Sequence, residues 1–132
     1  MTTEDEVRLV VPATPEFLRL ARITAAGLAS RLGFTLDQVE DLRLAIDELC
    51  LGLTGPNGRD GMVQLRYVLR GGALEVFGEG QFEATAAPAA ALELSELILN
   101  ALVDEHELST SDGRPGFRLV KRRQSNGSAR PS

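Results

Sequence analysis

The sequence of 132 residues predicts an α+β fold: a two-layer sandwich in which about three helices cover one face of a mainly antiparallel mixed sheet. Two observations carry this prediction. The spacing of apolar residues changes between a strand period and a helix period in the order β-α-α-β-β-α-β-β. Hydrophobic residues make up 43% of the chain and charged residues 25%, which is the balance of a globular domain with one core.

The first strand and the first helix follow from local signals. Alternating residues over 7–11 predict a short strand. Thr14 stands where an N-cap belongs, and Pro15 occupies the first helical position, where its missing N–H costs nothing. Apolar residues then recur at steps of three and four until Gly33, which ends the helix.

The second helix has a clear beginning. Thr35 is the predicted N-cap, and Gln38 completes a capping box three residues later. One apolar stripe runs along this helix, which we expect to end among the glycines and the proline of residues 52–58.

The remaining elements form two strand pairs separated by a helix. Strands around a two-residue turn at Gly71-Gly72 predict a hairpin, and residues 78–91 are predicted to form a loop. A third helix is expected over 94–102, followed by a short segment around His106 and a strand over 117–120.

These elements predict one domain over residues 7–123, with a flexible lead-in over 1–6 and a disordered tail over 124–132. The net charge of −5 disfavours direct binding to nucleic acid. No apolar run is long enough for a membrane span, and the acidic start does not fit a secretory signal, so we expect a cytoplasmic protein. Cys50 and His106 are too far apart in sequence to suggest zinc, and no metal site is predicted.

Several segments together resemble a known family. They are the run 21–24, the Asp47-Glu48-Leu49 segment, and the endings 102–105 and 117–121. In this order they look like RsbW-type anti-sigma factors, which are serine kinases of the GHKL (histidine-kinase-like) ATPase fold, and the resemblance covers residues 7–122. By this resemblance, Arg22 matches an arginine on the first helix that contacts partner proteins.

The family's metal motif is incomplete in this sequence. In the family, a helix presents a glutamate base and an asparagine four residues later, and the asparagine oxygen holds Mg²⁺ on the phosphates. Glu48 matches the base, but the asparagine position falls on Gly52, which has no side chain. The loss of this oxygen predicts that magnesium is not held here.

The adenine and phosphate motifs also depart from the family pattern. The family's Asp-x-Gly-x-Gly falls on residues 78–82, where Gly78 replaces the aspartate, Gly80 keeps the central glycine and Phe82 replaces the last one. Glu79 is one residue out of place, which on a strand points it to the opposite face. The phosphate-binding Gly-x-Gly falls on residues 93–95, and the lid is cut to residues 82–92.

The sequence therefore leaves two main candidate functions. The first is an anti-sigma factor or partner-switching adaptor that binds a sigma factor, an anti-anti-sigma (STAS) protein or both, needs no cofactor, and forms a homodimer by resemblance. The alternative is an active serine kinase that uses Mg-ATP, with Glu48 as its base. A dimerisation module without a sigma-factor partner is a third possibility. A purely structural interpretation also remains, in which Asp47 and Glu48 belong to a solvated helix face.

Overall fold

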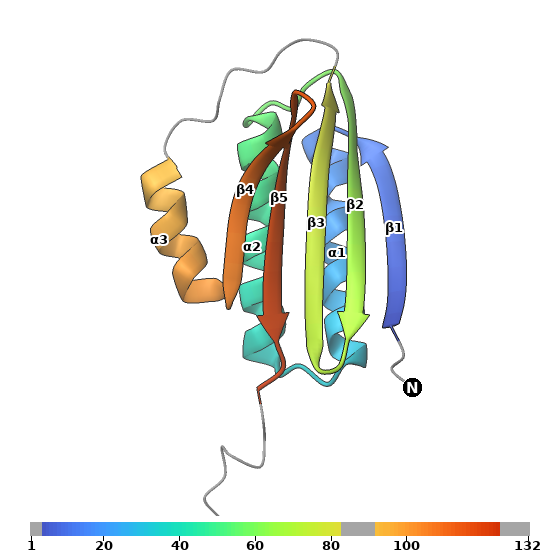
Figure 1. The fold of residues 1–132 in the computed structure, drawn as a ribbon, viewed down its shortest axis with the longest axis vertical. Coiled ribbons are helices and arrows are strands. Elements are labelled where there is room, and N and C mark those ends of the chain that lie inside the picture. Colours follow the sequence, from blue (N-terminus) through green and yellow to red (C-terminus); the bar gives the residue numbers. More distant parts are fainter. Residues whose placement is uncertain (1–3, 83–91, 125–132) are drawn as a thin grey trace, which may run out of the picture.

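The computed structural model describes residues 4–82 and 92–124, with the backbone alone for 92–95. In this part of the chain, five strands form one sheet and three helices lie on one side of it (Figure 1). The elements are β1 (Glu4–Pro12), α1 (Pro15–Arg31), α2 (Leu36–Thr54), β2 (Gly61–Arg70), β3 (Ala73–Phe82), α3 (Leu92–Leu102), β4 (Glu105–Ser111) and β5 (Arg114–Arg122). The predicted α+β class and the predicted order of elements are confirmed.

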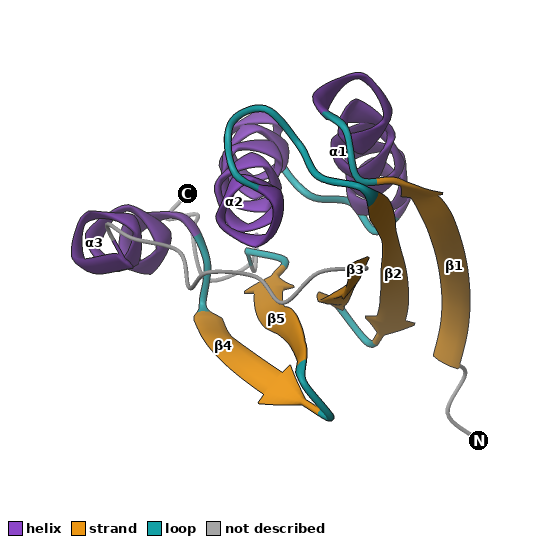
Figure 2. Cartoon of the chain, turned by 90° about the horizontal axis from the view of Figure 1, so that it is seen from above, coloured by secondary structure: helices purple, strands orange, loops and turns teal. Residues whose placement is uncertain are grey.

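The sheet has the strand order β1-β2-β3-β5-β4. Every pairing among the described strands is antiparallel, so the sheet is not mixed. Figure 2 shows α1 and α2 above the sheet and α3 beside α2, near the edge that β4 forms. This arrangement of a helical layer on an antiparallel sheet fits the GHKL architecture that the resemblance predicts.

The core lies between the helices and the sheet. Alternate residues of β2, β3 and β5 point into it, among them Leu65, Tyr67, Val76 and Leu119, and each of these four is fully buried. The buried Tyr67 hydroxyl donates a hydrogen bond of 2.8 Å to the carbonyl oxygen of Ala21 in α1. This bond ties the first helix to the sheet. No helix in the described ranges is long and apolar enough to cross a membrane.

The first strand is longer than the sequence predicts. Residues 4–6 belong to β1, where they pair with residues 68–70 of β2, so the predicted lead-in over 1–6 is wrong for these three residues. Pairing with β2 explains the extension, and Glu4 accepts a hydrogen bond of 2.6 Å from Arg70 of that strand. The predicted tail lies outside the described residues from 125 onward.

The predicted loop after the second hairpin strand begins later than expected. Residues 78–82 continue β3, because the Phe117 ring packs against Gly78 and the Phe82 ring packs against Gly80. Aromatic rings supply the packing that glycines in a strand lack. The rest of the predicted loop, residues 83–91, lies outside the described residues.

Three predictions about helix ends can be compared with the structure: the capping box of α2, the glycine after α1 and the N-cap of α1. The first two agree, and the third agrees only in part. Thr35 and Gln38 form the predicted capping box with two hydrogen bonds of 3.1 Å. Gly33 follows α1 with φ 86°, a conformation that favours glycine. Thr14 is the N-cap residue of α1, but its hydroxyl makes no capping bond and has no hydrogen-bond partner within the described structure.

Candidate functional site

The two residues that align with the family's metal motif lie on α2, one turn apart near its C-terminal end. Glu48 is half-buried, and Gly52 is exposed. A Cβ atom at Gly52 would have no other atom within 4 Å, so the space beside this residue is open. The helix therefore presents the glutamate that matches the family's base, together with an empty position where the family has its metal ligand.

The aspartate position of the adenine motif falls on Gly78, in the middle of the sheet. This residue is buried on the helix-facing side of β3, opposite Phe117 of β5. A Cβ atom at Gly78 would lie 2.4 Å from Cε2 of the Phe117 ring. An aspartate therefore does not fit at this position unless the phenylalanine ring moves, because the ring occupies the space that its side chain would need.

A second ring occupies the end of the same motif. Phe82 is the residue at the family's last glycine, and its ring lies 2.4 Å from where a Cβ of Gly80 would be. The ring also packs against the hydrophobic core. Above it, the guanidinium carbon of Arg59 lies 4.3 Å from the ring centroid, at the distance of a cation–π contact. The helix-facing side of β3 is thus filled by side chains along the whole motif.

The third motif and the lid stay predictions. The side chains of residues 93–95 and the segment 83–91 lie outside the described residues, and Glu96, the next described residue of α3, is exposed.

Arg22, the predicted partner-binding residue, lies on α1 and points toward α2. Its Nη1 atom donates a hydrogen bond of 2.7 Å to Oδ2 of Asp47, and about a third of its side chain is exposed. Its Nε atom is buried and has no hydrogen-bond partner in the described structure. Two apolar residues of the same helix are also exposed, Leu20 at 40% and Ile23 at 55% exposure, on other sides of the helix. The role of Arg22 in partner binding remains a prediction, whereas its link between the helices is observed.

Sequence reasoning identifies Phe82 in the motif but misses Phe117 and Arg59. Only the pairing of β3 with β5 brings Phe117 beside Gly78, and only the fold brings Arg59 to the ring of Phe82. The interpretation of Asp47 as part of a solvated helix face does not account for the hydrogen bond that it accepts from Arg22, which depends on how α1 crosses α2. The glycines at 78 and 80 are the available signal, because a glycine in a strand often marks a site where another group approaches closely.

Two other residues that could carry chemistry have structural surroundings. Burial, with a smaller contribution from the charge of Asp47, raises the pKa of the Cys50 thiol to about 12, so the thiol is protonated at neutral pH. His106 is half-buried on β4. No group of three or more His, Cys, Asp or Glu side chains is placed to hold a metal ion in the described part of the chain.

Comparison with known proteins gives a consistent set of relatives. The chain is 34% identical over 79 residues to the serine-protein kinase RsbW of Bacillus pumilus, 36% over 75 residues to that of Bacillus subtilis, and 33% over 78 residues to that of Listeria monocytogenes. These matches cover 54–57% of this chain and 47–50% of each relative, so the chain spans about half the length of the relatives it matches. No protein-family model matches the chain.

Proposed function

Because this chain is homologous to the RsbW-type serine-protein kinases over about half of their length, we propose that it is an anti-sigma factor or partner-switching adaptor. It regulates transcription in the cytoplasm by binding a sigma factor, an anti-anti-sigma (STAS) protein or both. It does so through protein contacts alone, without bound ATP.

The observation that carries this proposal is the Phe117 ring at Gly78. In the family, an aspartate at this position accepts a hydrogen bond from the adenine amino group. Here the position has no carboxylate, and a ring lies where its Cβ would be. Phe82 and Arg59 cover the next two positions of the motif. Gly52 adds an independent loss, since it offers no side-chain oxygen to a magnesium ion.

A melting experiment tests the absence of nucleotide. A ligand at 100 times its dissociation constant stabilises a fold by about 2.7 kcal/mol, which moves the melting temperature by several degrees. We expect no shift with millimolar Mg-ATP or Mg-ADP, with the Bacillus subtilis relative as the positive control. A shift of several degrees in this chain would contradict the proposal.

The partner surface is tested through Arg22. The ion pair with Asp47 is partly exposed and contributes well under about 1 kcal/mol to folding, because water screens it. An arginine that anchors an interface is worth about 2 kcal/mol or more in binding. Arg22→Ala should therefore weaken binding to the sigma factor or STAS partner about thirtyfold, as calorimetry measures it, and change the free energy of unfolding little.

The matched control for Arg22 is Arg43→Ala, which removes a partly exposed arginine and its ion pair with Glu40 from α2. We expect this variant to bind like the parent protein. Equal affinities of the parent protein, Arg22→Ala and Arg43→Ala would show that Arg22 does not contribute to the interface. The partners themselves are sought by affinity purification from native extract, and the expected homodimer by sedimentation.

One observation keeps the kinase as a second candidate. Glu48 stands one turn before Gly52, and the space beside Gly52 is open. If the kinase is active, phosphate from labelled ATP should appear on a serine of the STAS protein, and Glu48→Gln should abolish the transfer. If the parent protein transfers no labelled phosphate to the STAS protein, the kinase is excluded and the adaptor function stands.

A further inference from the structure

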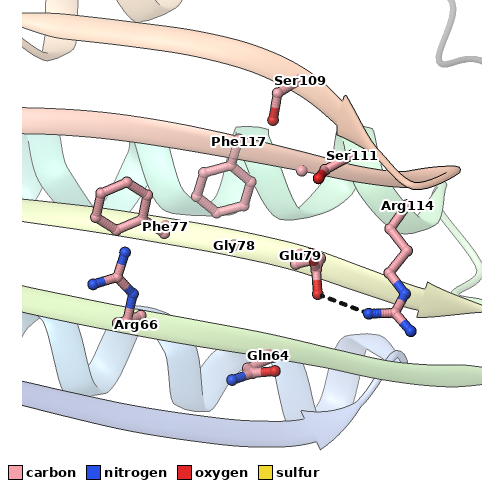
Figure 3. Close-up of a pocket in the computed structure, with 10 residues that line it drawn as sticks. Gln64, Arg66, Phe77, Gly78, Glu79, Ser109, Ser111, Arg114 and Phe117 are labelled. Carbon is pink, nitrogen blue, oxygen red and sulfur yellow. Dashed lines mark ion pairs between the residues drawn. The ribbon is translucent and has the colours of Figure 1, made fainter.

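The face of the sheet that carries no helices bears a dense set of charged side chains. Pairs of arginine and glutamate from neighbouring strands cover it, and their stems bury Val68 and Val120 to 2% and 6% exposure. Within this cover lies a hollow of about 290 Å³ (Figure 3). Its lining comes from β2, β3, β4 and β5, so it crosses most of the sheet.

One glycine of the lining lies at a point where β5 lies close against β3. A Cβ atom at Gly116 would lie 2.8 Å from the carbonyl oxygen of Gly78 and 3.4 Å from Oγ of Ser109. The two strands can approach this closely because residue 116 has no side chain. Glu79 lines the same hollow, on the face opposite to Gly78, as the alternation of the strand predicts.

Two arginines approach the hollow from different strands. In Figure 3, Arg66 lies over Phe77, with its guanidinium carbon 4.2 Å from the ring centroid, and Arg114 reaches toward Glu79. Two guanidinium groups and one carboxylate therefore line the hollow, and the carboxylate of Glu6, which pairs with Arg66, lies outside the lining.

The ion pairs of these two arginines are longer than those of their neighbours. Arg66 lies 3.4 Å from Glu6, and Arg114 lies 3.7 Å from Glu79. Three other arginines of this face make pairs of 2.6 Å: Arg8, Arg70 and Arg118. An arginine with a long ion pair can still form a short, two-point hydrogen bond with an incoming carboxylate.

We propose that this hollow binds an acidic, extended segment of a partner protein. Charge complementarity selects carboxylates, one at Arg66 and one at Arg114, because their side chains come from positions on β2 and β5 too far apart for one small anion. With two strand spacings of about 4.8 Å and four residues of about 3.3 Å between their backbones, the separation suits an extended chain. The site lies on the face opposite to α1 and does not depend on the adaptor function.

The probe is a fluorescent peptide with glutamates at alternate positions, compared with the same peptide in which glutamines replace them. Loss of a charged hydrogen bond costs about 1.5 kcal/mol or more, so Arg66→Gln and Arg114→Gln should each weaken binding about tenfold. Glu79→Gln removes the competing carboxylate and should strengthen binding about threefold. Arg43→Gln is the matched control, since it makes the same change of charge on α2, and should leave binding within about twofold.

Several results would overturn the proposal. They are no binding of the acidic peptide to the parent protein, equal binding of the glutamine peptide, and equal losses in Arg114→Gln and Arg43→Gln. Displacement of the peptide by millimolar inorganic phosphate would make the hollow a general anion site and would also overturn it. Circular dichroism of each variant shows that the fold is intact.

Discussion

Gly52 and Gly55 show how backbone conformation decides what a glycine does at the end of α2. Both positions are open, because a Cβ atom added at either glycine would meet no atom within 4 Å. Gly52 is inside the helix, whereas Gly55 is its C-cap with φ 81°. A helical glycine is worth about 1 kcal/mol less than alanine, and a residue with a side chain is strained at positive φ.

Gly52→Ala should therefore raise the free energy of unfolding by about 0.5–1 kcal/mol, as urea titration measures it. Gly55→Ala is the control at an equally open position, and it should lower the free energy by about 1 kcal/mol. An unchanged free energy of unfolding in Gly52→Ala would mean that the last turn of α2 is not formed in solution.

Cys50 makes the stability of the fold depend on pH in alkaline solution. Burial raises the pKa of its thiol from 9.0 to about 12 in the folded protein. The unfolded chain therefore releases this proton first, so the stabilisation is complete below about pH 9 and falls as the pH rises toward 12. Tyr67, whose pKa burial also raises, adds to the same trend.

Cys50→Ala should remove part of this slope, at most about 1.4 kcal/mol per pH unit. The measurement is the free energy of unfolding at a series of pH values above 9, with Tyr67→Phe as a companion variant. Equal slopes in Cys50→Ala and the parent protein would show that the thiol is not buried as described.

The candidate site could be predicted from the sequence only where it follows from local periodicity. The four-residue step from Glu48 to Gly52 and the opposite facing of Gly78 and Glu79 are of this kind, and the structure has both. The contact of the Phe117 ring with Gly78 could not be predicted, because the register of β3 against β5 joins residues that lie 39 positions apart in the chain. The ion pair from Arg22 to Asp47 likewise spans two helices.

At the scale of elements, the capping box of α2 could be predicted because it is a contact between residues three apart. The extent of the strands was harder to predict, since their ends depend on pairing. The last strand shows this: the sequence predicts it over 117–120, but it begins at Arg114, and only Asp112 and Gly113 form the turn before it, with φ 54° and 77°. Arg114 to Gly116 continue β5, where they pair with β4.

The continuation of β3 depends on the contact between Phe117 and Gly78. Phe117→Ala should lower the free energy of unfolding by about 3–5 kcal/mol, because it leaves a cavity in the core. Gly78→Ala should cost about 1–3 kcal/mol, because its Cβ would collide with the ring. In the double variant, we expect the alanine at 78 to cost little, since the ring is gone.

The coupling between these two substitutions is measured by denaturant unfolding of the four proteins in the cycle. Phe82→Ala provides a second background, in which Gly78→Ala should keep its full cost because that ring packs on Gly80 instead. Additive effects of Phe117→Ala and Gly78→Ala would contradict the proposed packing.

At the scale of the whole molecule, one face of the sheet is covered by helices and the other by ion pairs. Antiparallel sheets can leave one face to water, and here arginine and glutamate stems shield the few apolar residues of that face. The sequence predicts that polar and apolar residues alternate along these strands. Which arginine pairs with which glutamate depends on the order of the strands in the sheet. That β5 rather than β4 lies beside β3 could not be inferred from the order of the strands along the chain.

This charged face should make the fold sensitive to acid. Hydrogen bonds from Arg122 and Arg118 lower the pKa of Glu105, and a hydrogen bond from Arg8 lowers that of Glu6. A carboxyl group with a lowered pKa in the folded state stabilises the fold above its unfolded value of 4.5. That stabilisation is lost as the pH falls through the folded pKa.

We therefore expect the free energy of unfolding to decrease below about pH 4.5, and to decrease less steeply in Glu105→Gln and in Glu6→Gln. Chloride at about 1 M should reduce the slope of the parent protein as well, because both carboxylates are exposed and salt screens them. Glu40→Gln is the control, since its ion pair with Arg43 lies on α2, away from this face. If all four proteins lose stability with the same slope in acid, the ion pairs of the sheet do not hold its open face together in solution.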